Sequence, residues 1–209
     1  MLPLKEMLMS QIKNDVLVVM PYKQSGAQGN EIRITLTGWR KFCQFNYRFV
    51  VIGEFDEALK QEFPWVRFIE CPSVPKKEGQ YSPHLDIMNK FKVIARLYEQ
   101  EYDGFVYMTD DEYPVKPFEL SDITTVHYHN KTFIGNEKCP QSYWNYDKWK
   151  TRQLLDKEGL HHYNYTTHYP CYFEFKKMEE IRKKYNMLNE SYVFDDIYFN
   201  YFVHEEPVL

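Results

Sequence analysis

The stretch FVYMTDDEY (residues 105–113) places three adjacent carboxylates, those of Asp110, Asp111 and Glu112, directly after an apolar run. An apolar run of this length suits a buried strand. Like charges that gather where a strand ends repel one another unless a cation lies among them, and a divalent metal ion is the usual cation in such a place. The stretch therefore predicts a buried strand that ends at an acidic, metal-binding edge.

The first half of the chain repeats this alternation of strand and helix patterns. The segments between the apolar runs carry apolar residues at helical spacing. Strands separated by helices predict an α/β fold with a mostly parallel sheet that helices cover on both faces. The runs that we expect to form strands are residues 15–20, 48–53, 66–70 and 104–108.

Ligands of such open sheets bind beyond the carboxyl ends of the strands. Two loops should meet there, PYKQSG (21–26) after the first strand and TDDEY (109–113) after the fourth. The loop at 21–26 lacks the spacing of a P-loop or of a dinucleotide fingerprint, so its glycines indicate only that the backbone can approach a ligand closely.

The second half of the chain is less regular. We expect short strands at residues 124–129 and 131–136, and helices at about 174–185 and 193–204. A Tyr/Trp-rich stretch at 141–150 suits either a sugar-binding surface or a packing patch. Without a repeat or a clear linker, the chain predicts a single domain over residues 1–209.

Composition and charge exclude several classes of protein. A hydrophobic content of 44% and a charged content of 27% are ordinary for a globular chain. The net charge of −4 argues against general binding to nucleic acid or anionic membranes. The four cysteines lack the spacing of a zinc site, and no apolar run is long enough to span a bilayer. With no signal-peptide pattern at the start, we expect a cytoplasmic protein without a transmembrane segment.

The stretch NKFKVIARLYEQEYDGFVYMTDD (89–111) resembles a segment of GT-A glycosyltransferases. In that family a helix that opens with a basic residue leads through "YD" into a strand ending in a DxD motif. The resemblance implies a GT-A-like, Rossmann-like fold, a nucleotide-sugar donor, a hydroxyl acceptor such as a carbohydrate, and Mn²⁺ or Mg²⁺ as cofactor. It implies polysaccharide or glycoconjugate synthesis as a possible setting, with residues 15–120 as the donor half and 121–209 as the acceptor half.

The same resemblance assigns residues to the donor. Asp111 is the expected metal ligand, and Asp110 is an additional ligand or a ribose contact. Thr109 stands where the family has the first acidic residue, and Glu112 is expected to face solvent or to support the pair. Lys90 is expected to approach the nucleotide, with Lys92 as the alternative on the same helix. At the end of the first expected strand, the residues that should line the nucleotide are Pro21, Tyr22 and Lys23.

The second half supplies the expected acceptor-side residues. The pair Asp195 and Asp196 is either a helix cap or the base that takes the proton of the acceptor hydroxyl. His168 and His204 are candidates for a third metal ligand. His168 is alternatively an acid–base or phosphate-binding group.

A second resemblance is to the Stealth family of sugar-1-phosphate transferases. The stretches FVYMTDDEYPVKPFELSDI, THYPCYFEFKKMEEI and YVFDDIYFNYF are similar to its acidic, "HxP" and late acidic blocks. The chain departs from that family in its first strand, which reads VVMPYK, and near Tyr192, where the family has an arginine. This resemblance implies attack on phosphorus with His168 in a catalytic role. A non-catalytic sugar- or nucleotide-binding protein of the same fold is the third alternative.

Overall fold

The computed structural model describes residues 15–74, 82–128 and 143–203. The chain divides into two compact units, each considered as far as the structure describes it. The first consists of Met1–Ser73, Val93–Thr125 and His168–Phe175, and the second of Val74–Lys92, Val126–Thr167 and Lys176–Leu209. This division differs from the expected donor half (15–120) and acceptor half (121–209), because each unit contains segments of both halves. The single domain stays a prediction.

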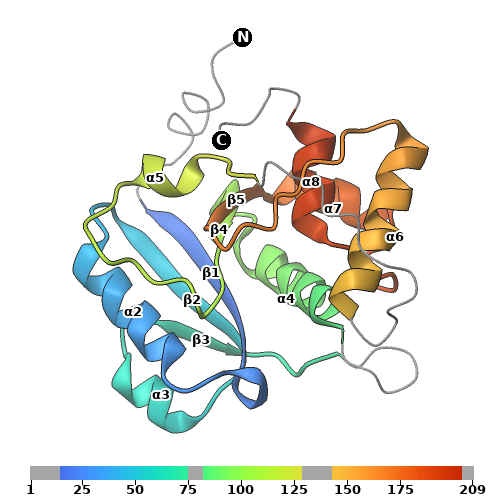
Figure 1. Ribbon diagram of the computed structural model, residues 1–209. Coiled ribbons are helices and arrows are strands. Elements are labelled where there is room, and N and C mark those ends of the chain that lie inside the picture. The colour runs from blue at the N-terminus through green and yellow to red at the C-terminus, as the bar shows by residue number, and fades with distance from the viewer. Residues whose placement is uncertain (1–14, 75–81, 129–142, 204–209) are drawn as a thin grey trace. The chain divides into compact units, whose positions relative to one another are not determined.

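The first unit is built on a five-stranded sheet with the order β3-β2-β1-β4-β5 (Figure 1). The first four strands pair in parallel, and β5 runs antiparallel to β4. The predicted α/β fold with a mostly parallel sheet is therefore confirmed. The strands are β1 (Val16–Lys23), β2 (Tyr47–Glu54), β3 (Arg67–Glu70), β4 (Gly104–Tyr107) and β5 (Cys171–Glu174).

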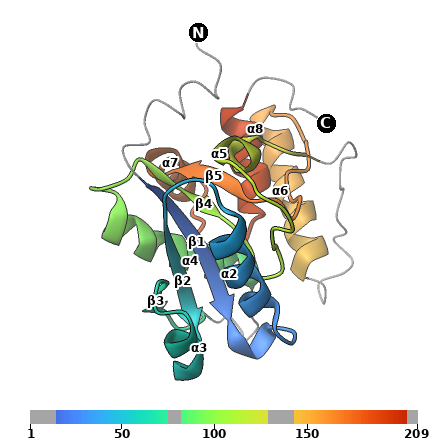
Figure 2. The same cartoon turned by 90° about the vertical axis from the view of Figure 1, so that its left-hand side faces the viewer.

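The central strands of the sheet are buried on both faces, so both sets of alternating side chains pack in the interior. Val18 and Met20 of β1 share a core with Leu36 and Trp39 of α2 (Glu31–Phe42) and with apolar residues of α3 (Glu57–Glu62). Leu17 and Val19, which belong to the other alternation, are at most 1% exposed. Two-sided burial explains why the strands read as continuous apolar runs instead of alternating ones. Figures 1 and 2 show α2 and α3 over the same face of the sheet.

Helix α4 (Pro83–Tyr98) leads into β4 as the sequence predicts, and the division between the units falls within it. A 3-10 turn, η1 (Gln24–Gly26), follows β1, and a short helix, α5 (Leu120–Thr124), is the next element in the chain after β4. A strand was expected at residues 124–129. Residue 124 instead ends α5, and residues 125–128, the last ones described in this segment, belong to no named strand. The strand expected at 131–136 lies outside the described residues.

The second unit is helical. Its elements are the first part of α4, α6 (Tyr143–Glu158), α7 (Phe175–Lys184, apart from Phe175) and α8 (Phe194–Phe202). The last two helices confirm the helical segments predicted there. Helix α6 was not predicted, because its Tyr/Trp-rich start reads as a binding surface. Phe91 of α4 packs edge-on against Phe194 of α8, with ring centroids 5.2 Å apart.

Pro21, Tyr22 and Lys23 are the last residues of β1, so the prediction that they form a loop is wrong. They continue the pairing with β2, where Pro21 lies beside Ile52. Proline usually ends a central strand because it lacks an N–H group. It is tolerated here because β1 pairs with β4 only through Val18 and Val19.

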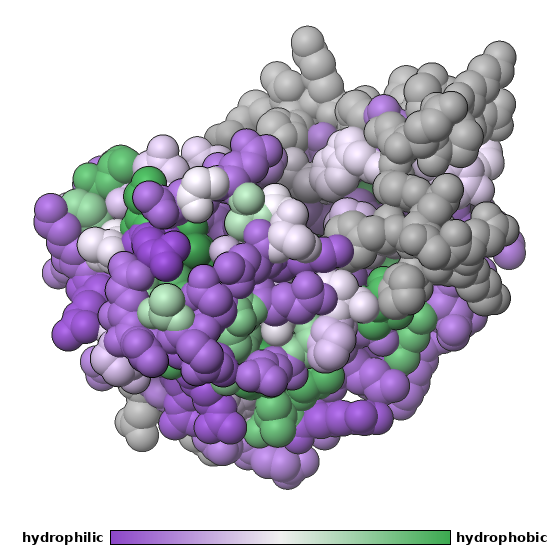
Figure 3. Space-filling view, turned by 90° about the horizontal axis from the view of Figure 1, so that it is seen from below, coloured by the Kyte–Doolittle hydropathy of each residue, from purple (hydrophilic) through white to green (hydrophobic). Residues whose placement is uncertain are grey.

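No described helix combines the length and the apolar character that a membrane crossing needs. Figure 3 shows a mainly hydrophilic face on which apolar residues occur in small, separate groups. Among the described cysteines, Cys43, Cys71 and Cys171, no disulfide is formed. Cys139 lies outside the described residues.

Candidate functional site

The strand order of the sheet reverses between β1 and β4. From β1 the chain builds β2 and β3 to one side, whereas β4 adds on the other side. Ligands of open α/β sheets bind at the carboxyl ends of the strands that flank such a reversal. The end of β1 and the acidic loop after β4 both lie there, as predicted. Thr35 of α2 contacts this loop. Its hydroxyl donates a hydrogen bond to the backbone carbonyl of Asp110, at 2.8 Å.

The antiparallel pairing of β5 brings a histidine to this edge. Tyr107, the last residue of β4, pairs with Cys171, the first residue of β5. Residues just after β4 therefore lie near residues just before β5. Nδ1 of His168 lies 3.6 Å from Oδ2 of Asp111. The backbone of His168 has a φ of 34°, a left-handed value that most side chains avoid.

Asp111, Glu112 and His168 form one group at this edge, here called the carboxylate–histidine cluster. Each offers one ligand atom, and these atoms lie within 4.8 Å of one another. The side chains of Asp111 and His168 are 46% and 76% exposed, so the cluster is open to solvent. Thr109 orients Asp111 by donating its hydroxyl to Oδ1. Two carboxylates and one imidazole are donors that suit divalent metals of the Mn²⁺ type.

Glu112 is half-buried beside the pair, and its expected role of supporting the pair stays a prediction. Its Oε2 atom is buried and has no hydrogen-bond partner among the described residues. Burial raises the pKa of Glu112 to about 8, with smaller contributions from Asp111 and Asp110 and opposition from hydrogen bonds with Thr109. The chain turns at Asp110 and Asp111, so the alternation of the strand does not continue to Glu112. A buried carboxyl beside two others fits a bound cation.

Asp110 is not part of the cluster. Its side chain is half-buried, and its pKa is raised by burial and then by the charges of Asp111 and Glu31. The described residues around the loop are thus predominantly acidic. Whether Asp110 contacts a metal or a ribose stays a prediction.

Tyr22 lies near the acidic loop, as expected for residues that share a site. It is 6% exposed, and its pKa is raised by burial and by Asp110, with opposition from Arg33. Arg33, in the first turns of α2, is paired with Glu62 at 2.7 Å. Pro21 and Lys23 are half-buried at the same strand end. Their contacts with a nucleotide stay predictions.

Lys90 is buried, not solvated. It is 1% exposed and forms an ion pair with Asp86, one turn earlier on α4. Asp86 also accepts a hydrogen bond from the backbone N–H of Val74, at 2.9 Å. The ammonium of Lys90 is therefore already neutralised within the second unit, and its approach to a nucleotide stays a prediction. Lys92 is half-buried.

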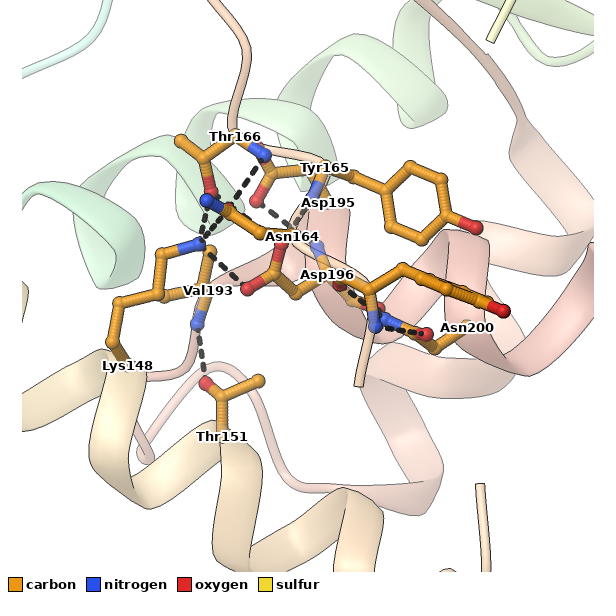
Figure 4. A network of polar contacts seen from close by, with 10 residues as sticks. Lys148, Thr151, Asn164, Tyr165, Thr166, Val193, Asp195, Asp196 and Asn200 are labelled. Carbon is orange, nitrogen blue, oxygen red and sulfur yellow. Dashed lines mark hydrogen bonds and ion pairs between the residues drawn. The ribbon is translucent and has the colours of Figure 1, made fainter. Parts of the chain in front are cut away.

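Asp196 is the centre of a buried polar network in the second unit (Figure 4). Its Oδ2 accepts a hydrogen bond from Nζ of Lys148 at 2.6 Å, and its Oδ1 accepts one from the backbone N–H of Tyr165 at 2.8 Å. Lys148 is 2% exposed and also donates to Asn164 and Thr166. Burial raises the pKa of Asp196, and the charge of Lys148 opposes that shift.

The network fixes an extended segment against α8. Asn200, one turn after Asp196, accepts from the backbone N–H of Tyr163 at 3.0 Å and donates to its carbonyl at 2.8 Å. Asn200 and Asp196 thus provide hydrogen-bond partners for backbone groups of Tyr163 and Tyr165. In a sheet, a neighbouring strand would satisfy these groups. The cavity beside the network measures about 10 Å³, the space of about one water molecule.

The two members of the acidic pair therefore differ. Asp196 is committed to Lys148 and Tyr165. Asp195 is 7% exposed, and the hydrogen bond described for it is from the backbone N–H of Asp196 at 3.1 Å. No side-chain cap is formed by Val193, the N-cap residue of α8. A catalytic role for either aspartate stays a prediction.

Sequence reasoning missed two features. One is Glu112 as a member of the cluster, for which the adjacent carboxylates were a usable signal. The other is a buried contact between His84 and Asp147 in the second unit. These two residues are far apart in the chain and belong to no motif, so only folding brings them together. His204, a predicted metal ligand, lies outside the described residues.

Comparison of the chain with models of known protein families finds no match, and comparison with curated proteins finds none either. The resemblance to GT-A enzymes therefore remains a hypothesis about function. The functional argument depends on the geometry of the site.

Proposed function

We propose that the protein is a metal-dependent transferase that moves a sugar from a nucleotide-sugar donor to a hydroxyl acceptor. The observation that carries this proposal is the carboxylate–histidine cluster of Asp111, Glu112 and His168 beside the reversal of strand order. The cluster combines the place where such sheets bind ligands with a donor set that suits Mn²⁺ or Mg²⁺.

The charge of the site supports a metal more strongly than the ligand geometry alone. Asp110, Asp111, Glu112 and the nearby Glu31 make the edge acidic. A nucleoside diphosphate is itself negative, so it would be repelled by this edge. A divalent cation held by the cluster reverses that repulsion, and when bound it supplies Lewis-acid stabilisation of the diphosphate leaving group.

The end of β1 supports the choice of a nucleotide. Tyr22 packs in the core next to Asp110, and this packing fixes the strand end beside the acidic loop. Pro21 and Lys23 flank it at the strand end. In this proposal these residues hold the nucleotide while the acidic loop holds the metal. On the acceptor side, Asp195 is the member of the acidic pair whose carboxylate, among the described residues, accepts only the backbone N–H of Asp196.

A sugar-1-phosphate transferase is the second candidate. The observation that favours it is the contact of His168 with Asp111, because an imidazole beside a metal site can take part in phosphoryl transfer. The products separate the candidates. Sugar transfer releases a nucleoside diphosphate, sugar-phosphate transfer releases a nucleoside monophosphate, and a binding protein releases neither.

A thermal-shift screen of nucleotide sugars, with and without Mn²⁺ or Mg²⁺, tests the proposal. A ligand that binds the native state raises the melting temperature. We expect the donor to add a shift of its own only when the metal is also present, and no such donor-dependent shift in Asp111→Asn. The control is Glu57→Gln, which removes an exposed carboxylate of α3. A donor that binds equally well without metal would contradict the proposal.

A further inference from the structure

The segment that follows β4 is held along helix α2, within the first unit. Its beginning is held by Thr35, a fully buried residue whose hydroxyl donates to the backbone carbonyl of Asp110 at 2.8 Å. Its end is held where the backbone N–H of Phe118 donates to the carbonyl of Phe42, the last residue of α2, at 3.1 Å. The helix therefore sets the course of residues 110–118.

Gly38 adds a contact between these two points. It lies one turn after Thr35 on the same face of α2. A Cβ atom at this position would lie 3.1 Å from both Cδ and the carbonyl oxygen of Pro114. Because glycine has no Cβ atom, Pro114 can approach the helix this closely. The segment is thus packed against α2 between Asp110 and Phe118 as well as at its ends.

Tyr113 stands between the acidic pair and this proline. A residue before proline is restricted to extended backbone, and successive side chains of an extended chain point to opposite sides. Exposure alternates accordingly, since Asp111 and Tyr113 are exposed whereas Glu112 and Pro114 are half-buried. Tyr113, which is 52% exposed, therefore presents its ring on the solvent side of the segment, as Asp111 does its carboxylate.

A fixed, exposed tyrosine next to a metal-binding group is suited to hold a ligand. Exposed apolar side chains that stand alone are common and need no function. Here the backbone on both sides of the residue is already ordered, so a ligand that packs on the ring loses little of its binding energy to ordering. The face of a tyrosine ring packs on the C–H face of a sugar, and its hydroxyl forms hydrogen bonds.

We infer that Tyr113 binds the sugar of the donor, with α2 holding it in position. This inference rests on the proposed function. In a nucleotide sugar the sugar is bonded directly to the outer phosphate, and a metal in the carboxylate–histidine cluster would bind the diphosphate. The sugar then lies beside the metal, and Tyr113 is two residues along the chain from the ligand Asp111. Tyr113 thus favours sugars with an apolar face and takes no part in bond breaking.

Calorimetry with two ligands that differ only in the sugar tests this role. The probes are UDP-glucose and UDP with saturating Mn²⁺, or GDP-mannose and GDP where the wild type binds guanine nucleotides only. We expect Tyr113→Ala to bind the nucleotide sugar about 3- to 10-fold more weakly, and to bind the nucleoside diphosphate and Mn²⁺ as the wild type does. Tyr113→Phe keeps the ring and should keep most of the affinity. An equal loss for both probes, or no loss, would overturn the inference.

Two further variants serve as comparisons. Leu97 is 47% exposed near the end of α4, which leads into the start of β4, whereas the cluster follows the end of that strand. Leu97→Ala should therefore bind both probes normally. Tyr169 is 57% exposed and follows His168, so it is the rival position for a sugar contact. A sugar-dependent loss in Tyr169→Ala, with none in Tyr113→Ala, would overturn the inference and leave the proposed function intact.

Failure of the proposed function has a different signature. If the wild type binds no nucleotide sugar with any metal, the transfer reaction is excluded and the role of Tyr113 falls with it. If the wild type binds and transfers the sugar while Tyr113→Ala binds the donor equally well, only the role of Tyr113 is excluded.

Discussion

The imidazole of His168 lies 3.6 Å from the carboxylate of Asp111 because β5 runs antiparallel to β4. One side of this strand pair supplies the two carboxylates of the cluster, and the other side supplies the imidazole. The cluster therefore depends on the pairing of two strands as well as on its ligands. Variants of the ligands and variants of the strand pair should have distinguishable effects.

Asp111→Asn should abolish metal binding without destabilising the metal-free protein. The side chain is exposed, and its neutral replacement relieves repulsion with Glu112 and Asp110. We expect the melting temperature without metal to stay the same or rise slightly. Isothermal calorimetry with Mn²⁺ measures the loss of binding.

Glu57→Gln, at an exposed carboxylate paired with Lys60, is the control for Asp111→Asn and should bind Mn²⁺ as the wild type does. Loss of folding in Asp111→Asn would indicate a structural role for this residue. Unchanged Mn²⁺ binding would remove Asp111 from the site.

Glu112→Gln should change how the stability of the metal-free protein depends on pH. The folded-state pKa of Glu112 is raised from 4.5 to about 8, so the folded protein holds this proton more firmly than the unfolded chain. Its contribution to stability is present below pH 4.5 and is lost as pH rises through about 8. The glutamine variant lacks this loss and should exceed the wild type in stability above pH 8 by about 1–3 kcal/mol.

Urea unfolding of both proteins on either side of this pH range measures the effect of Glu112→Gln. Saturating Mn²⁺ should reverse the order, because the ionised wild-type carboxylate then has a cation to bind. A difference between the two proteins that is constant with pH would show that Glu112 titrates like an exposed carboxyl.

Gly104→Ala tests the strand pair. A Cβ atom at this position would lie 2.2 Å from the backbone oxygen of Phe173 and 2.7 Å from the hydroxyl of Tyr172, so β4 and β5 must move apart. We expect a loss of about 1–3 kcal/mol in the free energy of unfolding and weaker Mn²⁺ binding. Gly26→Ala is the matched control, because nothing lies within 4 Å of its added Cβ. Equal effects of the two substitutions would contradict this account.

The sequence predicted the parallel part of the fold because local patterns encode it. The apolar runs that become β1, β2 and β4 are short and continuous, as two-sided burial requires, and the helices between them show clear apolar spacing. The acidic loop was recognisable for the same reason, since Asp110 and Asp111 directly follow such a run. These features need no information about distant residues.

Two of the features that the sequence did not predict depend on pairing between distant residues. Strand β5 is short and at the sheet edge, and nothing local shows that it pairs with β4 and carries His168 to Asp111. The contact of His84 with Asp147 likewise joins two helices. Sequence patterns place residues on an element, but they do not say which element lies next to it.

Asp196 allows a direct choice between a structural and a catalytic role. In the structural role, Asp196→Asn leaves the ammonium of Lys148 buried without its carboxylate, at a cost of about 3–5 kcal/mol. Lys148→Met should cost a similar amount by leaving the carboxylate alone. The double variant should cost clearly less than the sum of the two, because no buried charge then lacks its partner. Urea unfolding of the four proteins measures this coupling.

Lys150→Met provides the control for the coupling between Lys148 and Asp196. Lys150 pairs with Glu190 at the surface, with side chains 24% and 47% exposed, so its loss should cost less than about 1 kcal/mol. Turnover completes the test. We expect Asp196→Asn and Lys148→Met to lower turnover in parallel and only as far as they lower stability, because both act through the same network. A fall of roughly two to four orders of magnitude in Asp196→Asn alone, with stability near that of the wild type, would instead identify Asp196 as the base.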